Sequence, residues 1–587
     1  MKNKLLRTVS TLLLCLMLLA SCGDTQEGDL THTHDFTQKT ATAKYLNTEA
    51  TCSAAATYYF SCSCGAKGSE IFSDGKKLAH DFSAQREEAR YMKSAGTCFV
   101  PPTYYCSCTF CEKASVTVTF EGSKALAHDY SCEEPQGKYI KTEATKDSAA
   151  VYYKSCVCGA IGTETFSYGE VLRDYTDAEK LDYKPTSLTL TLYDVEDRLY
   201  GITYNTQKRP LRPVIRVCEG NSMNGSYKEY PAFVSEASSY TDNDEKFTYY
   251  IVKAEIHMED LKTYSYYAYD KYVDIGTEVA TVTTKDLDSN SFTFVHVSDS
   301  QADSSVGGSY FGEVLSNVAG KADFLIHTGD VVENSKHESD WTSMLDGNFE
   351  YLSEIPMMAI SGNHETTYKN GSYETDKHFN NQIPAQNSSA LGYFYSFVYG
   401  NAKFIMLNTN DLTSSKYLKD EQYYWLVDQL ENNDCTWTIV SMHNPMYSVG
   451  KYGSDPDRNS ICLSLRTQLQ DLFFEYGVDL VLQGHDHAIS RTYPIASLGY
   501  VSDEEWTTVD GVEYSVDPTG VIYLMNGPAG TQTRAPVAVD ETLYAHAETG
   551  RKASWAEITV SQDTITVTVK YHTGSVEKVY YSFGIKK

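Results

Sequence analysis

The chain has 587 residues, a formal net charge of −29 and a pI near 4.9. This length is several times that of a usual domain, so three or four folded units are expected. The acidic balance argues against general nucleic-acid binding, because neutralising phosphates requires a basic face that the sequence does not show. A site for an anion must therefore supply its own local positive charge.

The first residues have the pattern of an export signal. Basic residues precede the apolar run LLLCLMLLA, which is too short to span a bilayer comfortably. The run ends in LASC at Cys22 and resembles the lipobox of a bacterial lipoprotein. This resemblance implies a signal peptide at residues 1–21, lipidation of Cys22, and an exported, extracytoplasmic protein attached to the cell membrane by lipid. The alternative is an ordinary signal peptide with an incidental cysteine.

After a linker at residues 22–33, a repeat of about 47 residues occupies residues 34–175. Its three units open with the triplets HDF, HDF and HDY, and a fourth opening, RDY, has lost the histidine. Ten of the fifteen cysteines lie in this region, so the repeats depend on sulfur in a way that the rest of the chain does not.

Each repeat carries one histidine and up to three aligned cysteines. The sets are His34, Cys52, Cys62 and Cys64; His80, Cys98, Cys108 and Cys111; and His128, Lys146, Cys156 and Cys158, with Lys146 in a cysteine's place. One Cys-Cys-Cys-His set per repeat suits structural zinc, whereas export favours disulfides. Cys132 could substitute as a ligand or pair with another cysteine. Zinc and disulfides both stay open as the cross-links of the repeats. The array is interpreted as a spacer or a cell-surface contact module. It is similar to His/Cys repeats in surface proteins of anaerobic Gram-positive bacteria.

From about Lys184, short strands alternate with turns, and no helical period interrupts them. The runs SLTLTLY, LYGITYNT, PVIRVCEG, FTYYIVKAEI, TYSYYAYD and EVATVTTK predict a β-sandwich over residues 184–286. The phrase HMEDLK, followed by TYSYYAYD and VTTKD, is similar to the end of the fibronectin-like domain that precedes the catalytic domain of purple acid phosphatases.

Residues 291–587 show another rhythm, in which apolar runs that end in polar residues alternate with amphipathic helical segments. The runs are FTFVHVSD, ADFLIHTGD, PMMAISGNHE, AKFIMLNTND, TWTIVSMHNP and DLVLQGHDH. Helices are expected at KDEQYYWLVDQLEN and LRTQLQDLFFEYG. This alternation predicts a layered α/β domain, in which functional residues gather beyond the carboxyl ends of the strands.

Five strand ends carry the ligand types that hard and borderline metal ions prefer. They supply Asp299, Asp330, Asn363 with His364, His443, and His485 with His487. In this order, the motifs resemble those of the calcineurin-like metallophosphoesterase superfamily and, with the sandwich before them, its purple acid phosphatase branch. The resemblance implies a four-layer α/β/β/α catalytic domain, preceded by an all-β fibronectin/Ig-like sandwich and small Cys/His-containing repeats.

The resemblance also implies the roles of these residues. A first ion would bind Asp299, Asp330 and His487, and a second would bind Asp330, Asn363, His443 and His485. The ions would be Fe, Mn or Zn, and a hydroxide between them would attack phosphorus in line. His364 would stabilise the transferring phosphoryl group or protonate the leaving oxygen.

Two positions depart from the family pattern. Gln301 stands where the superfamily has a histidine, and we interpret it as a weak metal ligand or a partner of a ligand. Glu333 stands where purple acid phosphatases have a tyrosine, so the expected enzyme is colourless. Elsewhere, we interpret His296, His327, Cys435 and Cys462 as core residues, and Lys451 and Arg458 as solvated loop charges.

The function expected from the sequence is that of an exported, lipid-anchored, dinuclear phosphoesterase that hydrolyses phosphomonoesters. The same residues would serve a phosphodiesterase or a nucleotidase with another pocket. From a different class of function, the alternative is a surface-binding lipoprotein with a weakly active phosphatase-like domain. The expected partners are a phosphate ester, the membrane through the lipid, and cell-surface contacts through the repeats.

Overall fold

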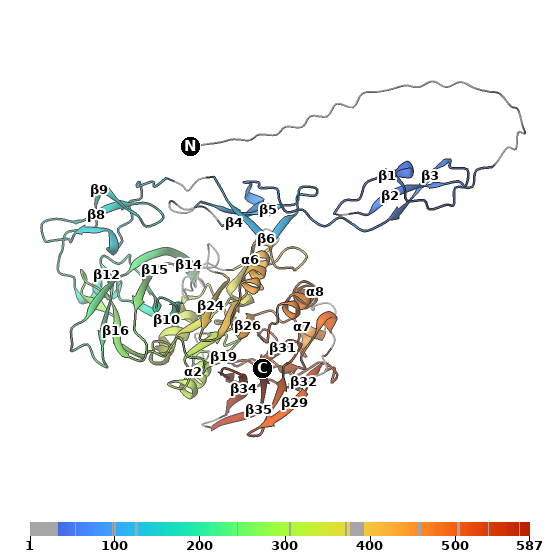
Figure 1. Cartoon of the computed structure of the whole chain (residues 1–587). Helices are drawn as coiled ribbons and strands as arrows, with labels where there is room; N and C mark the ends of the chain where they lie inside the picture. The colour runs from blue at the N-terminus through green and yellow to red at the C-terminus, as the bar shows by residue number, and fades with distance from the viewer. Residues whose placement is uncertain are drawn as a thin grey trace, which may run out of the picture. The chain divides into compact units, whose positions relative to one another are not determined.

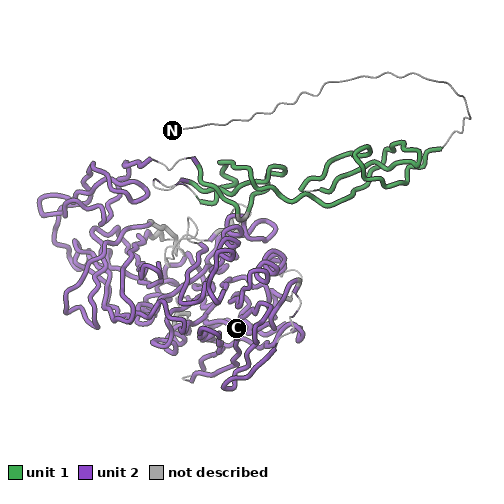
Figure 2. The backbone as a smooth tube through the Cα atoms, viewed as in Figure 1, with its two compact units in different colours: residues 1–95, 102–122 green, residues 96–101, 123–587 purple. Residues whose placement is uncertain are grey.

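The computed structural model describes residues 33–587, except for positions 53, 95, 97, 99–100, 124–126, 243–244, 304–306, 370–371, 376–392, 455–459, 500, 502–504, 538 and 574–575. The chain divides into two compact units, residues 1–95 with 102–122 and residues 96–101 with 123–587 (Figure 2). The predicted signal peptide, Cys22, most of the linker and Arg458 lie outside the described residues. No helix of the described part is long and apolar enough to cross a membrane.

Each repeat folds as a short 3-10 helix followed by a three-stranded antiparallel sheet. The helices end on a buried tyrosine, namely Tyr45, Tyr91 or Tyr139. The first repeat contains η1 Ala43–Tyr45, β1 Leu46–Thr48, β2 Ala56–Ser61 and β3 Lys67–Asp74; the second contains η2 Ala89–Tyr91, β4 Met92–Ser94, β5 Thr103–Ser107 and β6 Ala114–Glu121; the third contains η3 Gly137–Tyr139, β7 Ile140–Thr142, β8 Ala150–Ser155 and β9 Ile161–Tyr168. Such small sheets bury little apolar surface and need additional cross-links, such as disulfides or metal ions.

The prediction that the histidine and cysteines of one repeat together form one metal site is wrong. Cys52 lies with His80 and the cysteines of the second repeat, and not with His34. The reason is the length of β2: Cys52 precedes this six-residue strand, whereas Cys62 and Cys64 follow it. At about 3.3 Å per residue, the strand separates them by roughly 20 Å, so one ion cannot bind both ends.

A short helix, α1 Asp177–Leu181, leads into the sandwich, whose two sheets have the strand orders β10-β11-β15-β14 and β13-β12-β16-β17, with β18 paired to β16. The strands are β10 Thr186–Asp194, β11 Leu199–Thr206, β12 Pro213–Glu219, β13 Lys228–Pro231, β14 Phe233–Asp242, β15 Glu245–His257, β16 Thr263–Asp270, β17 Ile275–Gly276 and β18 Ala280–Thr283. The sequence did not indicate β13, β14 or β17. The polar run of β14 forms a sheet edge, where only pairing with β15 fixes it as a strand.

Two mixed sheets form the following domain (Figure 1). The first has the order β21-β20-β19-β33-β34-β35-β30-β29, with β19 Phe292–Val297, β20 Phe324–His327, β21 Met357–Ala359, β29 Glu505–Val509, β30 Val512–Val516, β33 Ser554–Val560, β34 Thr564–Thr573 and β35 Val576–Lys586. The second has the order β24-β25-β26-β27-β31-β28-β32, with β24 Tyr395–Tyr399, β25 Ala402–Met406, β26 Trp437–Met442, β27 Leu480–Gln483, β28 Ile489–Thr492, β31 Ile522–Asn526 and β32 Tyr544–Glu548. A hairpin, β22 Thr366–Lys369 with β23 Ser372–Thr375, stands apart.

The helices cover the outer faces of the two sheets. Those on the first sheet are α2 Gly307–Val318 and α3 Glu338–Leu345, followed by η4 Asp346–Asn348 and α4 Phe349–Leu352. Those on the second are α6 Asp420–Glu431 and α8 Ser460–Glu475, with the short α7 Lys451–Ser454 and η6 Ser497–Gly499 nearby in the chain. A third apolar cluster fills the space between the sheets. The predicted four-layer α/β/β/α class is therefore confirmed.

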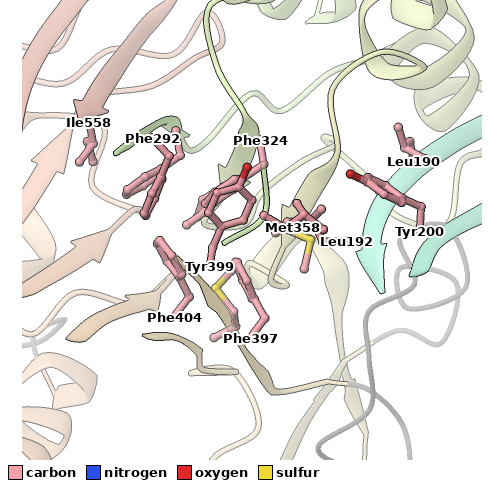
Figure 3. Close-up of a cluster of buried hydrophobic side chains, with 14 of the residues drawn as sticks. Leu190, Leu192, Tyr200, Phe292, Phe324, Met358, Phe397, Tyr399, Phe404 and Ile558 are labelled. Carbon is pink, nitrogen blue, oxygen red and sulfur yellow. The ribbon is translucent and has the colours of Figure 1, made fainter. Parts of the chain in front are cut away.

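The core between the sheets continues into the sandwich. Leu190 and Tyr200 of the sandwich belong to the same buried cluster as Phe324 and Met358 of the α/β domain (Figure 3). Beside this contact, the buried Tyr266 hydroxyl donates a 2.6 Å hydrogen bond to the carbonyl of Ser353. Since a shared apolar core resists separation, the sandwich is a structural part of the α/β domain.

Tyr266→Phe tests this junction. The substitution leaves the buried Ser353 carbonyl without its donor, so the free energy of unfolding should fall by about 1–3 kcal/mol. Chemical denaturation measures the change. Tyr227→Phe, at an exposed position of the same sandwich, should have no effect within error. Equal stability of both variants would contradict a buried hydrogen bond at the junction.

Candidate metal centre

The site lies where strands of both sheets end. In the first sheet, β19 and β20 run parallel, and Asp299 and Asp330 follow them. In the second sheet, β26 and β27 run parallel, and His443 and the pair His485 and His487 follow them. Carboxyl ends of parallel strands share one sheet edge, so two carboxylates and three imidazoles converge from loops that are far apart in sequence.

Five predicted site residues have a left-handed backbone conformation. The φ angles are 54° at Asp299, 39° at Gln301, 53° at Asp330, 75° at His485 and 39° at His487. Residues with a Cβ rarely adopt this region, and they persist there only when their surroundings hold them. The loops are therefore constrained to direct these side chains toward one another.

Asp330 stands at the centre of the cluster. Its ligand atom lies within 4.8 Å of those of Asp299 and His487, and it meets the same criterion with His443 and His485. Two of the imidazoles face these carboxylates, at 3.3 Å from His443 Nε2 to Asp330 Oδ1 and 3.3 Å from His487 Nε2 to Asp299 Oδ1. Two groups of potential ligands therefore share one carboxylate.

The segment η5, Asn363–Glu365, adds two of the predicted residues. Asn363 Oδ1 lies 3.1 Å from His443 Nε2, so the amide oxygen joins the second group. The backbone N–H of His364 donates to Asp330 Oδ1 at 2.9 Å, and the ring atom Nε2 of His364 lies 3.8 Å from Asp330 Oδ2. His364 therefore borders the shared carboxylate.

The charges of this cluster are suited to binding cations. Asp299 and Asp330 are each 1% exposed, and their ion-pair partners in the described part of the chain are histidines. Burial lowers the pKa of His443, but Asp330 outweighs this effect and raises the pKa to about 9. Burial holds the pKa of His485 at about 3, which keeps this imidazole neutral. Adjacent buried carboxylates repel each other unless positive charge lies between them.

Two of the imidazoles are oriented for ligation. The Nδ1 atom of His443 lies 2.8 Å from the Thr328 carbonyl, and that of His487 lies 2.8 Å from the Gln532 carbonyl. A ring that donates Nδ1–H to a carbonyl presents the lone pair of Nε2, as metal-binding histidines do. In both rings, the Nε2 atom faces a carboxylate.

Glu365 stands in the GNHE run, but it was not among the predicted site residues. Its buried carboxylate accepts hydrogen bonds of 2.7–3.2 Å from the backbone N–H groups of Asp330, Val331, Val332 and Gly362. Burial and then the charge of Asp330 raise the pKa of Glu365 to about 7. This side chain ties the loop after β20 to the loop after β21.

The two departures from the family pattern lie beside His364. Gln301 Nε2 is 2.9 Å from His364 Nε2, and the buried Oε1 of Gln301 has no hydrogen-bond partner among the residues that the structure describes. The carbonyl of Glu333 accepts from His364 Nδ1 at 2.6 Å, and the Glu333 carboxylate accepts from Gln532 Nε2 at 3.3 Å. Gln301 therefore retains an oxygen that could bind an ion, directly or through water.

The predicted core histidines are buried and hydrogen-bonded, His296 to the Thr328 hydroxyl and His327 to the Ser300 hydroxyl. Cys462 is also buried, and Cys435 is partly exposed. The Lys451 ammonium lies over the Tyr452 ring.

Two further residues near His485 were missed. The Tyr452 ring lies 4.0 Å from that of His485, and Arg534 Nη1 donates to the His485 carbonyl at 3.3 Å. The sequence gave no signal for Tyr452, because it lies outside the ligand motifs. Arg534 ends the run GPAGTQTR, which belongs to the family resemblance, but nothing in that run marks it as a neighbour of His485.

Comparison with known proteins gives the site a context. Residues 292–488 match the sequence profile of the family described as calcineurin-like phosphoesterase. This segment begins at β19 and ends just after His487, so it holds the whole cluster.

The candidate site therefore lies in a segment that is similar to calcineurin-like phosphoesterases.

Similar proteins include acid phosphatases. Human acid phosphatase type 7 is 28% identical over 239 residues, which cover 38% of this chain and 51% of that protein. Purple acid phosphatase 23 of Arabidopsis thaliana is 29% identical over 191 residues, covering 32% and 36%. An uncharacterized protein of Mycobacterium tuberculosis is 29% identical over 207 residues, covering 32% and 38%. The chain thus spans about half or less of the length of these curated relatives.

A solved structure shares the fold. The purple acid phosphatase from yellow lupin (Lupinus luteus) seeds matches with a TM-score of 0.58 at 17% identity, covering 69% of this chain and 74% of that one. The match extends well beyond the phosphoesterase segment, which makes up about a third of the chain.

Two glycines of the phosphoesterase domain permit the close approach of its loops. A Cβ on Gly362 would lie 2.1 Å from Asp330 Oδ1 and 2.2 Å from Asp330 N. A Cβ on Gly484 would lie 2.1 Å from the Ser298 hydroxyl oxygen. Such separations are impossible for real atoms, so larger residues at these positions would push the ligands apart.

Gly362→Ala should disrupt the cluster. The added methyl group must displace Asp330, and displacements near 1 Å can reduce catalysis by on the order of 10²-fold. Metal content by mass spectrometry and phosphatase rate should both fall. Gly347→Ala is the control, because a Cβ there meets nothing within 4 Å. A Gly362→Ala protein with the metal content and rate of the parent would contradict this account.

Proposed function

We propose that the protein is a metal-dependent phosphoesterase of the acid phosphatase type that hydrolyses phosphomonoesters with two metal ions. The observation that carries the proposal is the shared carboxylate: Asp330 belongs to two ligand groups, one with Asp299 and His487 and one with His443 and His485. A carboxylate between two ions is the arrangement that in-line displacement at phosphorus requires.

The residues fit such ions. The first ion would take Asp299, Asp330 and His487, and the second would take Asp330, Asn363, His443 and His485. The buried Oε1 of Gln301, which has no partner within the described part of the chain, supports a role for this residue at the first ion. Carboxylate, amide and imidazole donors suit Fe, Mn or Zn. When bound, such ions lower the pKa of water and polarise the phosphoryl oxygen.

His364 is the proposed catalytic residue of the chain itself. Burial lowers the pKa of His364, but Asp330 and then the Glu333 carbonyl outweigh burial and raise it. The ring is fixed through Nδ1 by that carbonyl, and Nε2 faces Gln301 and Asp330. When Nε2 is protonated and no longer accepts from the Gln301 amide, it could donate to the leaving alkoxide or stabilise the charge on the phosphoryl oxygens.

Substrate assays and metal analysis test the function. The chain should bind about two ions outside its cysteine sites, and chelation should abolish hydrolysis of a phosphomonoester until metal is restored. His364→Ala should lower the rate by about 10²–10⁴-fold, whereas His257→Ala, at a histidine of the sandwich whose side chain is 42% exposed, should not change it.

Several outcomes would change the proposed substrate, function or catalytic residue. Faster turnover of a phosphodiester or a nucleotide than of the phosphomonoester would reassign the substrate. The absence of ions would leave a surface-binding lipoprotein with an inactive domain, and an His364→Ala rate within about twofold of the parent would remove its role. An intense visible band from tyrosine-bound iron would contradict the inference drawn from Glu333.

We also propose that the protein is exported and held at the membrane by a lipid on Cys22, which the LASC sequence supports. In a bacterial host, the parent chain should partition into the membrane fraction and require detergent for extraction. Cys22→Ser should shift it to the soluble extract or leave an uncleaved precursor, whereas Cys15→Ser should behave as the parent. Equal partition of both variants would favour an ordinary signal peptide.

A further inference from the structure

The repeats contain three clusters of cysteine and histidine that the phosphoesterase site does not use. In each, the potential ligand atoms lie within 4.8 Å of one another. The clusters are Cys52, His80, Cys108 and Cys111; Cys98, His128, Cys156 and Cys158; and His34, Cys62 and Cys64. Each four-residue cluster takes one cysteine from a repeat and its other members from the next.

The distances within the four-residue clusters suit tetrahedral zinc. Zn–S bonds of about 2.3 Å and Zn–N bonds of about 2.0 Å place ligand sulfurs about 3.8 Å apart and sulfur about 3.5 Å from nitrogen. The observed Sγ separations are 3.9 Å for Cys52 and Cys108 and 3.2 Å for Cys98 and Cys156. The sulfur-to-Nδ1 separations are 3.4 Å for Cys111 and His80 and 3.3 Å for Cys158 and His128.

The repeated HDF or HDY triplet positions the histidine. The aromatic ring two residues after each histidine stacks on the imidazole, with centroids 5.3 Å apart for His80 and Phe82 and 5.4 Å for His128 and Tyr130. The stacking fixes the plane of the imidazole, and Nδ1 points at a cysteine sulfur. A disulfide framework would require neither the histidine nor the aromatic residue.

The turn after the central strand positions two of the cysteines. In the third repeat, Gly159, with φ of 90°, donates its N–H to the Cys156 carbonyl at 2.8 Å. In the second repeat, Glu112 replaces this glycine, has φ of 59°, and donates to the Cys108 carbonyl at 3.1 Å. A non-glycine residue in this conformation shows that the turn is kept where the sequence does not favour it.

We propose that a zinc ion joins each repeat to the next, with a cysteine before the central strand of one repeat completing the ligand set of the following repeat. Cys52 completes the site of His80, and Cys98 completes the site of His128. This rule explains Lys146, which stands at the aligned position of the third repeat, because the unit that follows opens with Arg173 in place of the histidine. The last repeat has no site to complete.

The alternative staple, a disulfide, fits less well. The cysteines of the two four-residue clusters are free thiols. A disulfide between two cysteines would leave the third cysteine and the histidine of each cluster without a function. Cys132, which the sequence analysis considered as a substitute ligand, instead pairs through its backbone with Ser155. It is not among the residues of the clusters given above.

Counting the zinc ions released by a thiol-specific mercurial tests the proposal in the full-length protein, because the phosphoesterase site contains no cysteine. The pairing of sites predicts opposite results for two double variants. Cys98→Ser with Cys158→Ser should release one ion fewer than the parent, because both residues serve one site. Cys98→Ser with Cys111→Ser should release two fewer. Cys132→Ser is the matched control and should release the parental number.

The reverse pattern would overturn the proposal, because a site within each repeat would place Cys98 with Cys111. Peptide mapping that finds a Cys98–Cys156 disulfide in the purified protein would also overturn it. A measurement on the parent chain guards against variants that fail to fold. Cobalt(II) substitution should produce thiolate-to-cobalt charge-transfer absorption, which oxygen and nitrogen ligands do not give, and its absence would exclude metal in the repeats.

Discussion

The candidate metal centre depends on one buried carboxylate that is not itself among the expected ligands. Glu365 accepts from the backbone of Asp330, Val331 and Val332 on one loop and of Gly362 on another. Because these N–H groups must converge on a single carboxylate, the loop after β20 curls sharply, and Asp330 adopts a φ of 53°. The same bonds bring Gly362 so close to Asp330 that no Cβ fits between them. The shared carboxylate of the site is thus positioned by another carboxylate behind it.

This arrangement requires a rigid support, which the packing of the domain provides. The strands that end at the site are buried on both faces, between the shared core and the outer helices. The shared core extends into the sandwich, where Tyr266 is hydrogen-bonded to Ser353, which precedes β21 in the chain. Close-packed interiors resist small displacements, so the loops can hold strained backbone angles that an isolated segment would relax. The sandwich therefore contributes to the site without supplying a ligand.

Site residues could be predicted from the sequence where a local pattern marks them. Residues and strands whose roles depend on contacts with distant segments could not. Asp299, Asp330, His443 and the pair His485 and His487 could be found because each follows an apolar run that marks a strand end. Glu365 was missed because its function lies in N–H groups that no side-chain pattern reveals. β14 was missed because an edge strand needs only a partner and not an apolar face. The grouping of Cys52 with His34 was wrong because proximity in a repeat was taken as proximity in space, and β2 separates them.

The same chain thus uses two means of holding ligands in place. In the phosphoesterase-like domain, a large packed core positions the oxygen and nitrogen donors. The repeats bury far less apolar surface around their ligands. Among the described residues, the apolar cluster of the third repeat has four buried members, Tyr139, Ala144, Ala150 and Tyr152, which is too little to fix a fold of this size. The cysteines and histidines must supply the missing stability, and ligands shared between neighbours make the stability of each repeat depend on the next. The repeats would then be coupled along the chain through their metal sites, as stacked repeats are through apolar interfaces.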